Sequence, residues 1–220
     1  MHLFVTGTDT GVGKTLVAAA LLHKCRRAGL RALGMKPIAA GSDVQGANAD
    51  VSALVAASSS RAALELVNPY RFGPAIAPHI AAAEAGVSID LEHIVACYRS
   101  LCAQAEAVIV EGAGGFLLPL GEGIDGGDLA QRLGLPLVLV VGMRLGCLNH
   151  ALLTAAAIAA RGLVLAGWVA NRIDAEMPRF DENLRSLQSR LTGPLLGVLP
   201  YLSDPDPLEA AAWIELPPDN

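Results

Sequence analysis

The stretch Phe4-Val5-Thr6-Gly7-Thr8-Asp9-Thr10-Gly11-Val12-Gly13-Lys14-Thr15 decides the fold. An apolar run, 2–5, leads into this turn, and a helical pattern, 16–28, follows it and ends at Gly29. Strand, glycine-rich turn and helix N-terminus form a phosphate site, because backbone N–H groups and the positive end of the helix face the anion. Lys14 is therefore predicted to meet the β- and γ-phosphates, and the Thr15 hydroxyl to hold Mg²⁺.

The motif departs from the pattern G-x-x-x-x-G-K-[ST] at one position. Thr8 stands where the pattern has its first glycine, and Gly7 comes one residue too early. The alternative is a glycine-rich turn followed by a chance Lys-Thr pair. The strand before the turn and the helix after it favour a nucleotide site.

The composition is that of one α/β domain. Of the 220 residues 53% are apolar and 4% aromatic, so we expect one domain, 1–220, with 215–220 as a disordered tail. The net charge of −5 argues against a nucleic-acid partner, and the apolar runs are too short to span a membrane. The four cysteines lack metal-binding spacing, which together with the lack of a signal peptide predicts a cytoplasmic protein.

Apolar strand patterns alternate with helical patterns, which predicts a mostly parallel sheet with helices on both faces, of the phosphate-loop NTPase type. Ligands gather at the carboxyl ends of such strands, so we expect 10–15, Lys36, Glu111 and Asn171 to converge. The expected strands are 2–5, 31–35, 107–111, 135–142, 163–170 and 195–199, with a loop over 68–78. The expected helices are 16–28, 49–57, 79–85, 89–105, 177–191, 208–214 and one capped by Asn149 that ends at Arg161.

Three charged residues outside the phosphate loop are candidates for chemistry. Pro37 stiffens the exit from its strand and presents Lys36, although Lys36 could also be a solvated strand-end lysine. Glu111 closes an apolar strand, which is the position of the second metal-holding carboxylate of phosphate-loop proteins. Asp50 is favourable in the first turn of its helix whether or not it has a ligand. We expect Lys14 and Glu111 to lie at the surface of a cleft, so that replacing either by Ala leaves the fold intact.

Six segments resemble, in the same order, those of the dethiobiotin synthetase family. They are Thr6-Gly7-Thr8-Asp9-Thr10-Gly11-Val12-Gly13-Lys14-Thr15, Lys36-Pro37-Ile38-Ala39-Ala40-Gly41, Asn68-Pro69-Tyr70 with Pro78-His79, Glu111-Gly112-Ala113-Gly114-Gly115, Leu145-Gly146-Cys147-Leu148-Asn149-His150-Ala151 and Gly167-Trp168-Val169-Ala170-Asn171. The resemblance extends over nearly the whole chain. Any one segment is weakly or moderately specific, whereas five in register are a strong match.

The resemblance implies an ATP- and Mg²⁺-dependent ligase that closes the ureido ring of dethiobiotin from 7,8-diaminopelargonic acid and CO₂. In that reaction one amine captures CO₂ as a carbamate, and the carbamate oxygen attacks the γ-phosphate. The second amine then displaces phosphate from the mixed carbamic–phosphoric anhydride. The triphosphate and the carbamate are both anions, so positive charge has to be concentrated between them. Lys14, Lys36 and Mg²⁺ would supply this charge.

The resemblance also implies roles for individual residues. Lys36 and Lys14 are catalytic, and the metal is held by Thr15, Asp50 and Glu111. The implied nucleotide-binding residues are Gly11, Val12, Gly13, Lys14, Thr15, Leu16, Glu111, Gly112, Ala113, Gly114, Asn171, Pro200, Tyr201, Leu202 and Asp206. The implied substrate-binding residues are Thr10, Lys36, Ala40, Leu145, Gly146, Cys147 and Asn149. Family members often carry a hydroxyl residue at the position of Ala40. The hydrogen bond from that hydroxyl to the diamine is therefore either lost here or made by Ser42 or by the backbone.

Two features leave alternatives open. Asn171-Arg172-Ile173-Asp174 also has the look of guanine-reading loops, although the resemblance favours ATP. The start of the helix at 145–149 has free N–H groups that suit the diamine's carboxylate, and the resemblance places it on the partner subunit of a homodimer. The null alternative is a capped helix with no ligand.

The main functional alternative is a positioning or partition ATPase that dimerises with nucleotide and binds a protein partner. Such a loop generally carries a second lysine early in the motif, where this chain has Thr8-Asp9-Thr10. A ligase of the cobyrinic acid type would need an added glutaminase domain, for which 220 residues leave no room. Both alternatives are therefore less favoured than the synthetase.

Overall fold

The computed structural model describes residues 1–43 and 46–218. In chain order its elements are β1 (His2–Gly7), α1 (Lys14–Arg27), β2 (Ala32–Met35), β3 (Ile38–Ala40), α2 (Ala49–Ala57), α3 (Leu64–Val67), β4 (Tyr70–Phe72), α4 (Pro78–Glu84), α5 (Leu91–Cys102), β5 (Ala107–Glu111), β6 (Pro119–Gly121), β7 (Ile124–Asp125), α6 (Gly126–Leu133), β8 (Leu137–Met143), α7 (Cys147–Ala160), β9 (Leu165–Arg172), α8 (Phe180–Gln188), β10 (Leu195–Leu199) and α9 (Pro207–Ala210).

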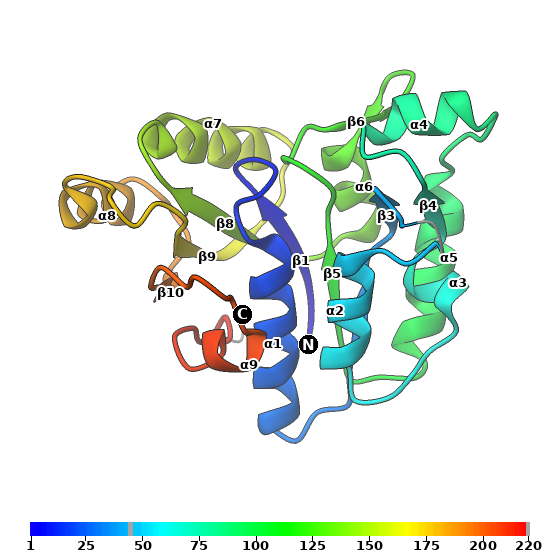
Figure 1. Cartoon of the computed structure of the whole chain (residues 1–220), viewed down its shortest axis with the longest axis horizontal. Coiled ribbons are helices and arrows are strands. Elements are labelled where there is room, and N and C mark those ends of the chain that lie inside the picture. The colour runs from blue at the N-terminus through cyan, green and yellow to red at the C-terminus, as the bar shows by residue number, and fades with distance from the viewer. Residues whose placement is uncertain (44–45, 219–220) are drawn as a thin grey trace.

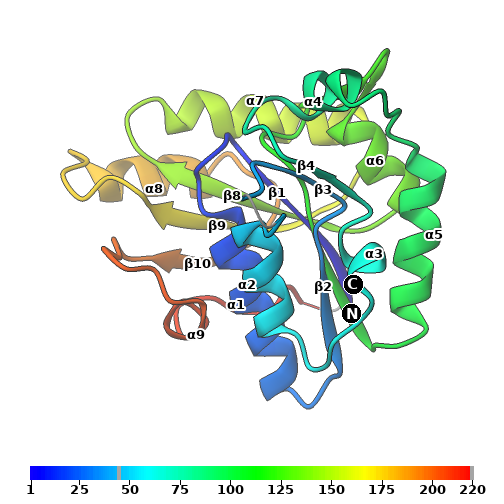
Figure 2. The ribbon, with the colours of Figure 1, turned by 45° about the vertical axis from the view of Figure 1, so that its right-hand side comes forward.

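Six parallel strands form the central sheet, in the order β10-β9-β8-β1-β5-β2. Successive side chains of a strand point to opposite faces, so β1 contributes Leu3 and Val5 to one apolar core and Phe4 to the other. The helices α1, α2 and α9 lie over one face of the sheet, and α5 to α8 lie over the other (Figures 1 and 2). The prediction of a parallel sheet covered on both faces is confirmed.

Two small sheets are added at the β2 side of the central sheet. β3 pairs with β4 in parallel, and β6 pairs with β7 in antiparallel orientation. Figure 1 shows β3, β4 and β6 together with α4 on the side of β1 and β5 away from α8. These additions surround the carboxyl ends of β2 and β5, where Lys36 and Glu111 lie.

The structure corrects three sequence expectations. Asn149 does not cap a helix: α7 begins at Cys147 and its N-cap is Gly146, at φ 95. The expected loop 68–78 contains β4. Helix α6 was not expected because it starts with two glycines, which are poor helix formers. A capping box of Asp125 and Asp128 fixes its first turn.

The end of the described chain makes specific contacts. Glu215 N–H donates to Leu196 O at 2.7 Å, and Leu216 packs against the core beneath α1. Of the tail expected to be disordered, 219–220 lie outside the described residues. Among the residues that the structure does describe, no helix is both long and apolar enough to cross a membrane.

Candidate active site

The phosphate loop joins β1 to α1 at the centre of the sheet. Its last residue, Gly13, has φ 90 and is the N-cap of α1, so that Lys14 is the first helical residue. A Cβ atom on Gly13 would lie 2.2 Å from Asn171 Nδ2. Glycine is therefore required here both by the left-handed conformation and by the close approach of β9.

Lys14 is held by its own loop. Its Nζ donates to the carbonyl oxygen of Asp9 at 2.8 Å, and the residue is 6% exposed. Burial, with repulsion from Lys36, lowers the pKa of Lys14 to about 8. The Asp9 carboxylate pairs with Arg144 at 2.6 Å, which ties the loop to the end of β8.

The second lysine lies between two carboxylates that come from different elements. Lys36 Nζ is 2.5 Å from Glu111 Oε1 and 2.9 Å from Asp50 Oδ2. Burial alone would lower the pKa of Lys36, but the two carboxylates outweigh it and raise this pKa above its ordinary value. We call Lys36, Asp50, Glu111 and Thr15 the Lys36 cluster.

The Thr15 hydroxyl completes the cluster by donating to Glu111 Oε1 at 2.8 Å. Glu111 is 1% exposed and Lys14 is 6% exposed, so the expectation that both lie at the surface of a cleft is wrong. Its Oε2 is buried and has no hydrogen-bond partner among the described residues. Burial raises the pKa of Glu111, against the influence of Lys36.

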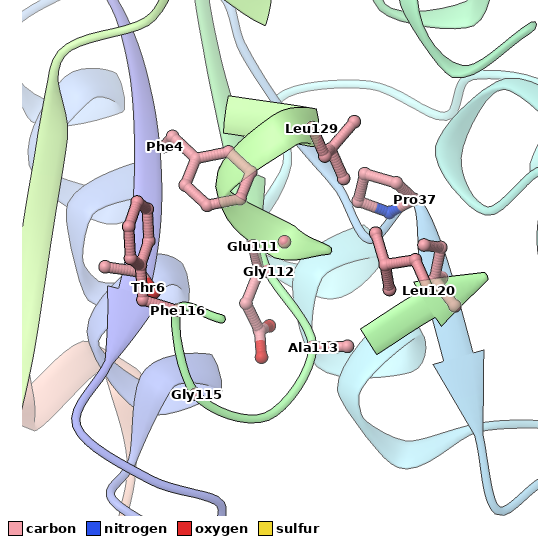
Figure 3. Close-up of a pocket in the computed structure, with 12 residues that line it drawn as sticks. Phe4, Thr6, Pro37, Glu111, Gly112, Ala113, Gly115, Phe116, Leu120 and Leu129 are labelled. Atoms are coloured by element: carbon pink, nitrogen blue, oxygen red, sulfur yellow. The ribbon is translucent and has the colours of Figure 1, made fainter. Parts of the chain in front are cut away.

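An apolar pocket explains this burial. Phe4, Pro37 and Leu129 stand around the pocket with Glu111 at its edge (Figure 3). A carboxylate against such a wall is deprived of water, which favours its neutral form unless cations compensate. The pocket therefore makes Glu111 dependent on Lys36 and on any cation bound nearby.

Three oxygen-bearing side chains meet in the Lys36 cluster: Thr15, Asp50 and Glu111. The Asn48 side chain accepts from Val51 N–H and caps α2, which places Asp50 in the first turn of that helix. A hydroxyl and carboxylates beside a phosphate loop are the ligands that Mg²⁺ prefers. The unpartnered Glu111 Oε2 leaves coordination capacity for such an ion.

An open cleft of about 460 Å³ lies in front of the cluster. It brings together three predicted substrate-binding residues, Thr10, Lys36 and Ala40, with Asp50 on its wall. The remaining wall is mostly apolar and comes from β3, the start of α4 and the loop after β5: Ile38, Ala39, Ala75, Ile76, Ala77, Pro78, Ala113, Gly114 and Leu118. Ser42 is not among the described residues that line it.

The predicted substrate residues at the start of α7 lie apart from this cleft. Of the described residues that line it, none belongs to 145–149. Leu145 is 94% exposed, Cys147 is buried and Asn149 is exposed. The substrate site predicted from the sequence is thus divided within one chain into two separate groups.

The predicted nucleotide-binding residues come from several separate segments of the chain. The Asn171 side chain contacts the phosphate loop, because its Nδ2 donates to Val12 O at 2.9 Å. Gly112, Ala113 and Gly114 form the loop after β5, and Leu16 packs against the core beneath α1. Pro200, Tyr201 and Leu202 follow β10, while the Asp206 side chain caps α9 by accepting from Leu208 N–H at 2.9 Å.

Sequence reasoning missed one residue beside the cluster. Asn68 appeared only as part of an Asn-Pro-Tyr segment, yet it is 5% exposed and donates to the Lys36 carbonyl oxygen at 2.6 Å. The signal that was available is an asparagine just before a proline, where a side-chain amide often binds backbone groups.

A parallel sheet with a glycine-rich loop after its central strand defines a nucleotide-binding protein of the phosphate-loop class. Solved structures agree with this fold. The septum site-determining protein MinD of Pyrococcus horikoshii, solved with Mg-ADP, superposes with a TM-score of 0.54 at 18% identity, covering 91% of this chain and 82% of that one. The receptor FtsY of Elizabethkingia anophelis gives 0.52 at 16% identity, covering 96% of this chain and 64% of that one.

Sequence comparison identifies the family within this class. The "AAA domain" family model matches residues 1–208. Proteins named ATP-dependent dethiobiotin synthetase BioD are 58% identical in Aromatoleum aromaticum, over 97% of this chain and 96% of that protein, and 54% identical in Nitrosospira multiformis, over 97% and 94%. The chain belongs to the ATP-dependent dethiobiotin synthetase family.

Proposed function

We propose that this protein is a dethiobiotin synthetase, a cyclo-ligase that joins 7,8-diaminopelargonic acid and CO₂ at the expense of ATP. The observation that carries the proposal is the Lys36 cluster, in which a buried cation lies between the phosphate loop and a cleft with an apolar wall. A diamine on a chain of methylene groups needs such a wall along its length and a cation where its carbamate forms.

Each charged side chain has a task in this reaction. Lys14 binds the β- and γ-phosphates, for which it must leave the Asp9 carbonyl. Lys36 binds the carbamate and holds it in line with the γ-phosphate, which removes the orientational part of the barrier. The positive charge then stabilises the oxygens that gain charge as the anhydride forms.

Mg²⁺ would be held by Thr15, Asp50 and Glu111, and when bound it would supply positive charge to the phosphate oxygens. The buried Oε2 of Glu111 supports this assignment. Since Lys36 now pairs with both carboxylates, a bound cation would compete for them and favour a turn of the lysine toward the cleft.

We also propose that two chains share each site in a homodimer. No residue of 145–149 is among the described residues that line the cleft, and the start of α7 presents the positive end of a helix outside it, which suits the diamine's carboxylate. Leu145 and Leu153 are exposed apolar side chains on this part of the chain, which suits a contact between copies.

The test of the function is co-substrate dependence. Purified protein with ATP and Mg²⁺ should release phosphate only when diamine and bicarbonate are both present, and mass spectrometry should find the ureido product. Equal phosphate release without diamine would overturn the proposal and favour a positioning ATPase. The likeness to MinD does not favour that alternative, because at 18% identity it reports the fold alone.

A further inference from the structure

The main chain at Lys36 lies at a break between two sheets. β2 ends at Met35 and β3 begins at Ile38, so that the peptide groups of Lys36 and Pro37 belong to neither strand. Lys36 is 4% exposed. A buried peptide carbonyl outside a sheet needs a hydrogen-bond donor from elsewhere.

Asn68 supplies this donor. Its Nδ2 lies 2.6 Å from the Lys36 carbonyl oxygen and 3.1 Å from that of Tyr70. The Lys36 N–H donates to Val67 O at 2.8 Å. Both polar groups of the Lys36 backbone are therefore fixed by two consecutive residues, at the end of α3.

This anchoring bears on where the ammonium can lie. A lysine side chain is a flexible stem, so its charge is localised by its partners and by the position of its Cα atom. Lys36 must reach Asp50 on α2 and Glu111 on β5 from a backbone outside the central sheet, whose next carbonyl, that of Pro37, accepts from Tyr70 N–H of β4 at 3.1 Å. A displacement of about 1 Å at a reacting group can cost about a hundredfold in rate.

We infer that Asn68 is a positioning residue for Lys36: its side-chain amide holds the Lys36 carbonyl and thereby sets where the ammonium enters the cleft. The inference rests on the proposed function in so far as Lys36 binds the carbamate. Asn68 does not line the cleft among the described residues, so its effect passes through the backbone and not through contact with substrate.

The test compares Asn68→Ala and Asn68→Asp with a control, Ser58→Ala. The aspartate keeps the size of asparagine but replaces the N–H donor by a carboxylate oxygen, which can carry a negative charge, whereas the alanine removes the amide without adding charge. Ser58 accepts from Gly34 N–H at 2.9 Å and donates to Leu54 O at 2.7 Å. Its removal loosens β2 two residues before Lys36 but leaves the hydrogen bonds of Lys36 itself in place.

Two measurements separate positioning from a general loss of structure. In turnover, both Asn68 variants should lower kcat by about tenfold to a hundredfold, with an ATP–Mg²⁺ Kd close to that of the wild type. The second measurement is the rate at which a lysine reagent acylates Lys36, read by mass spectrometry and divided by the rate for Lys24. In the Asn68 variants this ratio should be several-fold higher than in the wild type. The sequence has three lysines, so each is resolved. Ser58→Ala should change neither quantity.

The outcomes are distinct. Wild-type kcat and Lys36 labelling in the Asn68 variants, or equal changes in Ser58→Ala, would overturn the inference. If Asn68→Ala does not fold, the isosteric Asn68→Asp decides by the same two readouts. If the wild type makes no dethiobiotin, the proposed function fails, while the labelling comparison still decides whether Asn68 positions Lys36.

Discussion

Lys14 and Lys36 are buried cations at the same edge of one sheet, but they are held by different means. Lys14 binds a carbonyl of its own loop, five residues earlier in the chain. Lys36 binds a carboxylate that lies 75 residues later and a second one on α2. The pKa of Lys14 is lowered by burial and by Lys36, whereas that of Lys36 is raised by its carboxylates.

The difference fits the task that we propose for each lysine. A loop that binds a phosphate brings its own backbone donors, and the ligand supplies the missing negative charge. Before the ligand arrives, Lys14 is therefore a poorly compensated cation. The Lys36 cluster is compensated without ligand, and under the proposed function it would exchange partners when substrate and metal bind. The predictions below test this contrast.

The largest effect on turnover is expected from Lys14→Ala and Glu111→Gln. The first removes a charged side chain from the phosphate loop, and the second removes one from the Lys36 cluster. Turnover should fall by about a hundredfold or more in each, because a preorganised charge or its holder is lost. Glutamine is used because its carbonyl oxygen can still accept from Lys36 and Thr15, whereas alanine would leave both buried donors without this acceptor. Steady-state rates are measured on protein whose thermal unfolding matches the wild type, and near-normal turnover in either variant would contradict the assignment.

A pH effect should distinguish the two lysines. With a pKa of about 8 in the free protein, Lys14 is charged below pH 8, and bound triphosphate would raise that pKa. Binding therefore takes up a proton above pH 8, and ATP affinity should fall by up to about tenfold per pH unit there. Calorimetry in buffers of different ionisation enthalpy measures the uptake. Lys14→Arg, which stays charged, should abolish it, and a flat affinity in the wild type would refute the lowered pKa.

Recovery of activity in mixed dimers tests whether the start of α7 in one copy completes the site at the Lys36 cluster of the other copy. Two inactive variants are mixed and allowed to exchange subunits: Lys36→Ala, and one with bulky residues at Gly146 and Asn149. Half the dimers should be mixed with one intact site of two, so about a quarter of the wild-type activity should return. No recovery with mixed dimers present would place the whole site within one chain.

The smallest effect is expected on nucleotide binding by Lys36→Ala. If Lys36 serves the carbamate and Lys14 the nucleotide, the ATP–Mg²⁺ Kd should stay near that of the wild type while diamine binding and rate are lost. Calorimetric titration of each ligand decides the matter. A large fall in nucleotide affinity alone would assign Lys36 to the phosphates instead.

The phosphate loop could be predicted from the sequence because its geometry is local. Gly13 and Lys14 lie between a strand and a helix, and a short sequence motif is enough to predict this strand–turn–helix geometry. Lys36 and Glu111 were located because parallel strands bring their carboxyl ends together. The hydrogen bond from Asn68 to Lys36 was not predictable, since it joins residues 32 apart across a break between sheets.

The errors have similar causes. Asn149 looked like a cap, but the chain turns earlier, at Gly146, whose positive φ a spacing rule does not reveal. Helix α6 depends on tertiary contacts, because Arg161 pairs with Asp125 and Asp128 at 2.6 Å each. Glu111 was expected at a surface because its strand ends there, whereas the apolar pocket beside it closes off water.

The apolar wall of the cleft has a consequence for how such a site can change. Ile38, Ile76 and Leu118 come from β3, the loop before α4 and the residue before β6, none of which belongs to the six-stranded sheet. The half with the phosphate loop belongs to the six-stranded sheet, and MinD and FtsY share this fold. The half with the apolar wall, which we propose binds the diamine, is built on these additions to the sheet. A substitution in this wall therefore reshapes the groove one side chain at a time without changing a residue of the six-stranded sheet.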